Sequence, residues 1–378
     1  MTKTEKKITS RQLIIFFCIF SFSIKFLSLP QILSGDAGRD AWLSALFGGI
    51  LEFGLLFLAL TVLERRQNSD IYTDFKKTTT FAGAKLFALL ILTVFIVQIF
   101  IIIATMFDLL TDSIFTSLNH HKFIIPLVLL GVMFCFMPSR AIFRSGEIFY
   151  ILVALGLILS ILPALGQMEP RLVTPVLENG LWTPLRGTFR NLIFFESVAF
   201  LLIFSGDVEI TKHFKRKFMT TASLLSAFFV FFVFMTYSIF GPLSPEKGIA
   251  ITDLTIYSAF LTQGGRLDWI LVCIWLLLLL LRFGVTFFAI FMSVKYILGV
   301  KDSSSKGWAG GVGLGIAVSI YLTYILLFKS ADRLDAFTTA MTIPIAVLFF
   351  VIPIGAFIVG LILFKKEKSN NQTEVQDV

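Results

Sequence analysis

Long apolar runs constrain this chain more than any other feature of its sequence. A helix needs about 20 mainly apolar residues to cross the hydrocarbon core of a bilayer, and ten segments meet that requirement. They are predicted at residues 11–33, 41–63, 82–111, 122–138, 146–165, 187–205, 218–241, 268–297, 308–328 and 336–364. The alternation typical of barrel strands is absent from the sequence, so we expect helices. The chain is predicted to be an all-α membrane protein with ten transmembrane helices.

The composition agrees with a chain that lies mostly in lipid. Hydrophobic residues make up 57% of the 378 positions and charged residues only 15%, whereas a soluble domain carries about 25% charged residues. The net charge of +8 would be compatible with nucleic-acid binding. However, the basic residues lie in short segments between the apolar runs, where they orient a membrane protein. We therefore expect the lipid bilayer, and no nucleic acid, as a partner.

The distribution of basic residues predicts the orientation. Most of the 32 Lys and Arg residues lie in the segments on the same side as the N-terminus, which places both termini in the cytoplasm. The even number of spans agrees. We expect a cytoplasmic N-terminus at residues 1–10, a transmembrane domain at residues 11–365 and a disordered cytoplasmic tail at residues 366–378. Residues 251–263 are expected to form a short helix across the outer face.

Catalysis by a metal or a nucleophile is not expected. The cysteines lie singly inside apolar runs, and the histidines have no metal-ligand spacing with them. These residues are Cys18, Cys135, Cys273, His120, His121 and His213. No nucleophile–base set is present either. We therefore expect no cofactor, no metal and no enzyme activity.

Four ionisable residues interrupt the apolar runs near mid-depth: Lys25, Glu52, Glu196 and Arg282. A charge at this depth costs about 2.5–3.5 kcal/mol even on lenient insertion scales. We predict that Lys25 or Arg282 pairs with Glu52 or Glu196. Such pairs could simply pin helices together, or the four residues could belong to a functional site. The sequence supports both interpretations.

Two predicted spans contain polar interruptions. The stretch Ser21-Phe22-Ser23-Ile24-Lys25, followed by Pro30, predicts a break in span 1. The stretch Phe195-Glu196-Ser197, followed by Ser205-Gly206-Asp207, predicts a break in span 6. These spans begin the two five-helix halves, and the second half must insert upside down relative to the first. Paired breaks in inverted halves are typical of transporters with a binding site at the midplane. Free helix ends there would offer N–H groups to an anion such as a carboxylate.

Other polar residues have two possible roles. Gln98 and Thr286 lie in the middle of spans 3 and 8, where each could contact a ligand or hydrogen-bond a neighbouring helix. Asp108 and Asp112 lie near the outer end of span 3. Water can reach that depth, so we interpret them as solvated residues and not as part of a site.

Several short motifs occur in an order that resembles a known family. Gly38 to Ser44 (GRDAWLS) opens span 2 after Leu29-Pro30, and Pro175 to Gly180 (PVLENG) with Pro184 to Gly187 (PLRG) leads into span 6. Arg140 to Glu147 forms a charged entry to span 5. Over about residues 8–365 the chain resembles the GerAB-type B-subunit family of spore nutrient germinant receptors. That family is related to the amino acid–polyamine–organocation (APC) transporters.

The resemblance implies a LeuT-like fold in the inner membrane of a spore, beside an A and a C subunit of a germinant receptor. It also implies that the chain receives a small nutrient, often an amino acid. The residues expected by position to line the pocket are Ser21, Phe22, Ser23, Ile24, Lys25, Gln98, Ile102, Glu196, Ser197, Phe200 and Thr286. Lys25 departs from the small, uncharged residues common at this place. A lysine there could occupy a cation site or bind an acidic group.

Three functions are consistent with these features. The first is a sensor subunit, in which a nutrient shifts the equilibrium between two arrangements of spans 1 and 6 and so triggers germination. The second is a proton-coupled secondary amino acid transporter, in which Glu196 or Glu52 carries the proton. The third is an ion channel gated by the nutrient.

Overall fold

The computed structural model describes residues 8–65, 71–115, 117–257, 268–300, 306–327 and 331–376. Its α-helices are α1 (Ser10–Leu27), α2 (Leu29–Ala37), α3 (Ala41–Arg65), α4 (Ile71–Thr78), α5 (Phe81–Ser113), α6 (His120–Cys135), α7 (Ser139–Ile161), α8 (Trp182–Arg190), α9 (Ser197–Ile203), α10 (Phe214–Phe240), α11 (Ala250–Tyr257), α13 (Asp268–Leu298), α14 (Lys306–Leu327) and α15 (Ala331–Gln376). The 3-10 helices are η2 (Gly38–Asp40), η3 (Pro163–Gln167), η4 (Pro170–Val173), η5 (Leu192–Phe195), η6 (Ser205–Asp207) and η7 (Gly241–Glu246). The two short strands are β1 (Ile8–Thr9) and β2 (Val208–Glu209).

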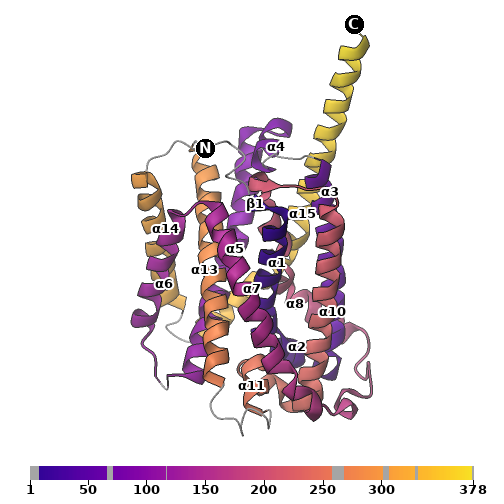
Figure 1. Cartoon of the computed structure of the whole chain (residues 1–378), viewed down its shortest axis with the longest axis vertical. Helices are drawn as coiled ribbons and strands as arrows, with labels where there is room; N and C mark the ends of the chain where they lie inside the picture. Colours follow the sequence, from indigo (N-terminus) through magenta and orange to yellow (C-terminus); the bar gives the residue numbers. More distant parts are fainter. Residues whose placement is uncertain are drawn as a thin grey trace.

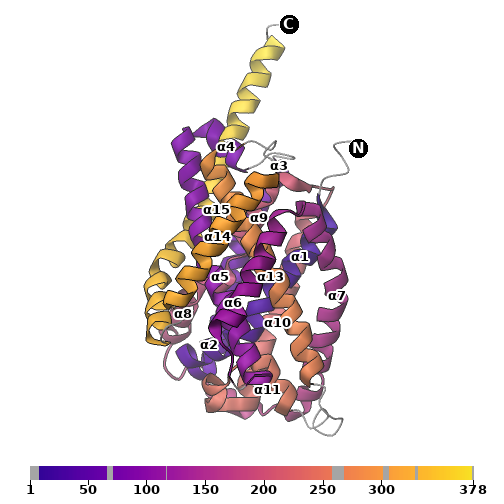
Figure 2. The same ribbon diagram turned by 90° about the vertical axis from the view of Figure 1, so that its left-hand side faces the viewer.

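The long helices run side by side along one axis and form a bundle (Figure 1). The start of α1 and the end of α15 lie at the same end, which we call the terminal end; α11 lies at the opposite end. Figure 2 shows the bundle from the side, with α2 and α8 toward the opposite end and α4 at the terminal end. In the core, α13 packs along α5 and α10 packs along α3.

The long helices confirm the membrane-protein class. Within the described ranges, eight helical stretches are long and apolar enough to cross a bilayer. Two of the ten predicted spans are not among them. Span 4 corresponds to α6, an apolar helix of 16 residues that stops shortly before Pro138, since proline disfavours helix in the residue before it. Span 6 is divided into α8, η5 and α9, so no single helix of that span is long enough.

Spans 1 and 6 run in opposite directions, as the inverted repeat requires. β1, at the start of span 1, pairs with β2, which follows span 6. At the other end of the two spans, the Asp36 carboxylate of α2 accepts hydrogen bonds from Arg190 and Asn191 at the end of α8. The beginning of each span therefore lies beside the end of the other.

The end of α15 differs from the sequence prediction, and the short helix predicted at residues 251–263 is described only in part. The helix α15 runs to Gln376, where the sequence predicts a disordered tail from residue 366, and its last turns project beyond the bundle (Figure 1). No Gly or Pro follows Gly360 in this segment, so nothing in the backbone ends the helix where the apolar run ends. The short helix predicted at 251–263 is present as α11; residues 258–263 of that prediction lie outside the described residues.

Candidate functional site

The break in span 1 lies at Ser28, between α1 and α2. Pro30 is the second residue of α2, and it has no N–H to bond the carbonyl four residues earlier, at Phe26. The side chain of Gln31 reaches back and donates to the Leu27 carbonyl at 3.0 Å. The prediction that the helix is interrupted at Ser21 to Lys25 is wrong. Those residues are helical and lie within α1, because hydroxyl and lysine side chains do not remove a backbone hydrogen bond as proline does.

The break in span 6 lies between Arg190 and Ser197. The sequence predicted the last three residues of this stretch, Phe195 to Ser197, as the break. Asn191 leaves the helical conformation at the end of α8, and Glu196 has the non-helical angles φ −92° and ψ 58° before α9 begins. The first N–H groups of α9 have no partner within that helix. A second interruption follows at η6, where the sequence predicted Ser205 to Asp207 to break the span.

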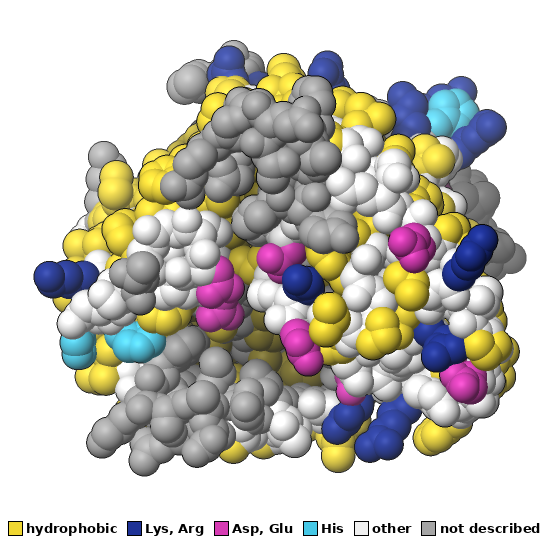
Figure 3. Space-filling view, turned by 90° about the horizontal axis from the view of Figure 1, so that it is seen from below, with side chains coloured by type: hydrophobic (Ala, Val, Ile, Leu, Met, Phe, Trp, Pro, Cys, Tyr) yellow, Lys and Arg dark blue, Asp and Glu magenta, His cyan; other side chains and the backbone are white. Residues whose placement is uncertain are grey.

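A cavity of about 750 Å³ lies beside both breaks. Its walls come from α2, α5, the end of α8 with η5, and the start of α15; the lining residues are Ser28, Ile32, Asp36, Val97, Phe100, Ile101, Ala104, Thr105, Asp108, Arg190, Asn191, Ile193, Phe194, Phe337, Thr339, Met341, Thr342, Ile343 and Ile345. Seen from the end opposite the termini, the surface has a hollow with apolar atoms in its depth (Figure 3). Size and lining are those of a small-molecule site.

Eight of the nineteen lining residues are polar or charged, and most of these have partners. At the break in span 1, the Ser28 hydroxyl lies 3.2 Å from the Thr105 hydroxyl of α5. Arg190 forms an ion pair with Asp36 at 2.8 Å, and the Asn191 amide donates to the other oxygen of that carboxylate at 2.8 Å. This cluster fastens α2 to α8. Asp108 has no ion-pair partner among the described residues.

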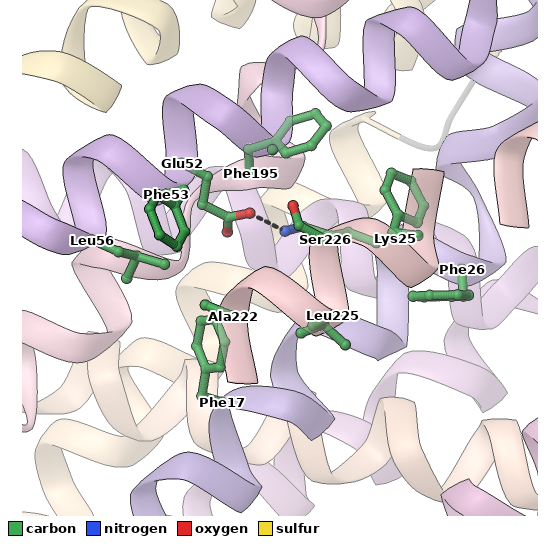
Figure 4. A pocket seen from close by; sticks show the side chains of 12 residues that line it. Phe17, Lys25, Phe26, Glu52, Phe53, Leu56, Phe195, Ala222, Leu225 and Ser226 are labelled. Atoms are coloured by element: carbon green, nitrogen blue, oxygen red, sulfur yellow. Dashed lines mark hydrogen bonds and ion pairs between the residues drawn. The ribbon is translucent and has the colours of Figure 1, made fainter. Parts of the chain in front are cut away.

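A buried ion pair lies deeper in the bundle. Lys25 Nζ of α1 lies 2.5 Å from the Glu52 carboxylate of α3 (Figure 4), and the Ser197 hydroxyl at the start of α9 donates to the other oxygen of Glu52. The Lys25 ammonium also lies 5.0 Å from the centre of the Phe195 ring. A space of about 10 Å³, enough for about one water molecule, adjoins the pair. The prediction that Lys25 or Arg282 pairs with Glu52 or Glu196 is confirmed for Lys25 and Glu52.

Arg282 and Glu196 form a second buried polar group. The Arg282 guanidinium of α13 donates to the Phe20 carbonyl and, at 2.8 Å, to the Ser23 hydroxyl of α1. Its centre lies 4.0 Å from the centre of the Phe20 ring. Glu196 accepts a hydrogen bond from the Gln98 amide at 3.4 Å and has no ion-pair partner among the described residues. Arg282 therefore ties α13 to α1, and Glu196 is a buried carboxyl group that Arg282 attracts without forming an ion pair with it.

The residues predicted to line the pocket lie beneath the cavity, and none of them belongs to its lining. Ser21 and Ser197 approach each other at 3.5 Å between their hydroxyls, next to the Lys25–Glu52 pair. Thr286 is buried, and its hydroxyl has no partner among the described residues. The apolar members Ile24, Ile102 and Phe200 are core residues. The Phe22 ring packs at a tilt against Phe26 and edge-on against Phe228. Their contact with a ligand stays a prediction.

Sequence reasoning missed the residues that do line the cavity. Asp108 is exposed, as its interpretation as a solvated residue implies, but it also lies in the cavity wall. Ser28, Thr105 and Phe194 were not singled out. Two signals point to them. Pro30 places the break near Ser28, and the residues of α5 that face the cavity, which are 97, 100, 101, 104, 105 and 108, follow the spacing of one helix face.

Comparison with known proteins decides the family. The family model described as "Spore germination protein" matches residues 7–333. The chain belongs to this family. The resemblance to the GerAB-type germination proteins is thereby confirmed, and the family is a permease-like one and not an enzyme family.

Curated relatives of the chain come from Bacillus subtilis (strain 168). The chain is 20% identical to the spore germination protein YndE over 313 residues, which cover 80% of this chain and 85% of that protein. It is 26% identical to the spore germination protein KB over 216 residues, or 53% of this chain and 54% of that protein. Both names agree with the family assignment.

A solved structure confirms the fold. The crystal structure of MhsT in complex with L-phenylalanine superimposes with a TM-score of 0.61 and covers 95% of this chain and 99% of that one, at 17% sequence identity. Since MhsT has the LeuT fold, this chain has the LeuT-like architecture that the family resemblance implied. Its long apolar helices and its family make it an integral membrane protein.

Proposed function

We propose that this chain is the nutrient-binding membrane subunit of a spore germinant receptor, and that a small nutrient such as an amino acid binds in the cavity beside Ser28 and Phe194. The observation that carries the proposal is the position of the cavity. It touches the breaks of both spans that begin the two halves, so a ligand there contacts segments that can change their relative position.

The sensor mechanism follows from these contacts. A ligand that binds more tightly to one arrangement of spans 1 and 6 shifts the population toward that arrangement. The Asp36–Arg190 cluster joins α2 to α8, so these two half-helices would move as one unit. In this proposal the receptor lies in the spore inner membrane with both termini in the cytoplasm, and the change passes to an A and a C subunit.

The test fills the cavity in the spore-forming host. Ala104→Trp places a large ring in the cavity wall, because Ala104 lines it on α5. Leu89→Trp is the matched control, because Leu89 lies on the same helix, is 49% exposed and does not line the cavity. Spores with Ala104→Trp should lose germination in response to the nutrient that a deletion strain fails to sense, whereas Leu89→Trp spores should respond. A normal response of Ala104→Trp spores, with the protein present, would refute the proposal.

A transport function is supported by a different observation. Glu196 is 5% exposed and hydrogen-bonded only through Gln98 among the described residues, so it is a carboxyl group that could accept a proton, whereas Glu52 is already paired with Lys25. Proteoliposomes with the chain alone separate the two functions. Concentrative uptake of a labelled amino acid, driven by a proton gradient and lost with Glu196→Gln, would establish transport; binding without uptake would leave the sensor function.

A further inference from the structure

We propose that the cavity selects its ligand by an ammonium group, which pairs with the Asp108 carboxylate, and accepts an apolar chain beside it. The inference deepens the proposed function and rests on it, because it assumes that the cavity is the ligand site. It names the chemical class of the nutrient: an amine or amino acid with an apolar side chain.

The first argument for an ammonium ligand comes from the charged side chains that line the cavity. Three charged side chains line it among the described residues: Asp36, Arg190 and Asp108. Arg190 and Asp36 neutralise each other at 2.8 Å, and Asn191 occupies the second oxygen of Asp36. The Asp108 carboxylate has neither an ion-pair partner nor a hydrogen-bond partner within the described ranges, although its backbone carbonyl accepts from the Thr111 hydroxyl. The wall therefore carries one negative charge that a ligand can neutralise.

The second argument comes from the position of Asp108 near the break of span 1. It lies on α5 one turn beyond Thr105, whose hydroxyl touches Ser28 at the break of span 1. A cation bound to Asp108 is thus within one helical turn of this break. Asp112 follows one turn later on α5 and adds negative potential at this end, where acidic side chains surround the hollow (Figure 3).

The third argument comes from the apolar walls of the cavity, which can accept the apolar chain of the ligand. Phe100, Ile101 and Ala104 lie on the same face of α5 as Asp108, and Phe194 and Phe337 belong to the other walls. An apolar chain next to an ammonium group can bury its surface against these side chains.

A ligand with a carboxylate and no amine would be repelled by Asp108, because both groups carry a negative charge. Its charge would approach Asp108 without a free cation among the described lining residues, because Arg190 is engaged with Asp36. Like charges brought together in this way discriminate against a ligand. The amino group is therefore the feature that distinguishes a ligand from its deaminated analogue.

The experiment measures binding to the full chain in lipid nanodiscs by isothermal titration calorimetry. Each probe set contains an amino acid, its decarboxylated amine and its deaminated acid: L-leucine, isopentylamine and isocaproate, and L-phenylalanine, phenethylamine and hydrocinnamate. We expect at least one set in which the amino acid and the amine bind and the acid binds about tenfold to a hundredfold more weakly, as for the loss of one charge-assisted contact.

Variants of one helix assign this preference to Asp108. Asp108→Asn should remove the preference for the amine, and Asp108→Glu should retain it. Asp112→Asn is the matched control. It also removes one negative charge from α5, one turn further along the helix, but Asp112 does not line the cavity. This variant should retain the preference for the amine.

Two results would overturn the inference, and they differ from failure of the proposed function. The acid binding as tightly as the amine would exclude selection by ammonium. An equal effect of Asp108→Asn and Asp112→Asn would mean that no direct contact with Asp108 exists. If no probe binds the wild-type chain, the inference fails, because the ligand class that it names does not bind; the Ala104→Trp germination test then decides the proposed function separately.

Discussion

The buried pair of Lys25 and Glu52 should be strongly coupled. Only 7% of Lys25 and 5% of Glu52 is exposed, and their charged atoms lie 2.5 Å apart between α1 and α3. With Lys25→Met, Glu52 keeps only the hydroxyl of Ser197 as a donor and becomes a buried charge without a counter-ion. With Glu52→Gln, the ammonium of Lys25 is left in the same position.

The magnitude follows from the burial of both partners. Removing one member of a buried pair costs about 3–5 kcal/mol, whereas replacing both by neutral groups of similar size is often close to neutral. We therefore expect each single variant to be destabilised by about 3–5 kcal/mol and the double variant by no more than one single. The coupling energy should be about 3 kcal/mol.

The assay is a double-mutant cycle on the free energy of unfolding of the purified chain in nanodiscs. Asp36→Asn and Arg190→Gln form the control cycle, because Arg190 is 51% exposed in its side chain and an exposed pair contributes about 1 kcal/mol or less. Additive effects of Lys25→Met and Glu52→Gln would refute the reasoning, since they would show that the two charges stabilise the fold independently.

Three further predictions concern other positions. Gly48→Val should destabilise the chain by about 1–3 kcal/mol, because a Cβ at this place would overlap the Phe195 ring. Gly54→Ala on the same helix should not destabilise it, since no atom lies within 4 Å of the added carbon. Equal melting temperatures of the two variants would contradict this prediction. Arg282→Met should lower the unfolding free energy by about 1–3 kcal/mol, because it removes the charged donor of two buried hydrogen bonds, and Arg282→Lys should lower it by less, as measured by thermal unfolding; no effect of either would show that the tie between α13 and α1 is dispensable. Burial raises the pKa of Asp253 in α11, so its charged form is disfavoured in the folded state. Asp253→Asn should therefore raise the melting temperature at pH 8, and the advantage should shrink as the pH falls through the raised pKa; an advantage independent of pH would be inconsistent with this cause.

The membrane class, the order of the spans and the inverted halves could be predicted from sequence because they depend on local signals. Runs of apolar residues determine where a helix can cross lipid, and four charges inside such runs indicate burial and pairing. The Lys25–Glu52 pair follows from this reasoning, although the choice between Glu52 and Glu196 does not, since it depends on how α1 packs against α3 and α9.

The position of the cavity proposed to bind the ligand could not be predicted in the same way. Gln98 and Ile102 are adjacent in sequence to Val97 and Ile101, yet one residue turns a side chain by about 100° around a helix. Only the second pair faces the cavity. Asp108 is exposed, as its depth suggests, and the role proposed for it depends on Arg190 being paired with Asp36, two residues from different halves.

The most direct test of the account is protection of a cysteine in the cavity by the nutrient. In a variant lacking Cys18, Cys135 and Cys273, Ala104→Cys places a thiol in the cavity wall, and Trp182→Cys, at a position 70% exposed outside the lining, is the control. The account predicts that the nutrient identified by germination slows alkylation of the thiol at position 104 and leaves position 182 unchanged. Equal alkylation rates at position 104 with and without saturating nutrient would contradict the claim that the ligand binds beside the two broken helices.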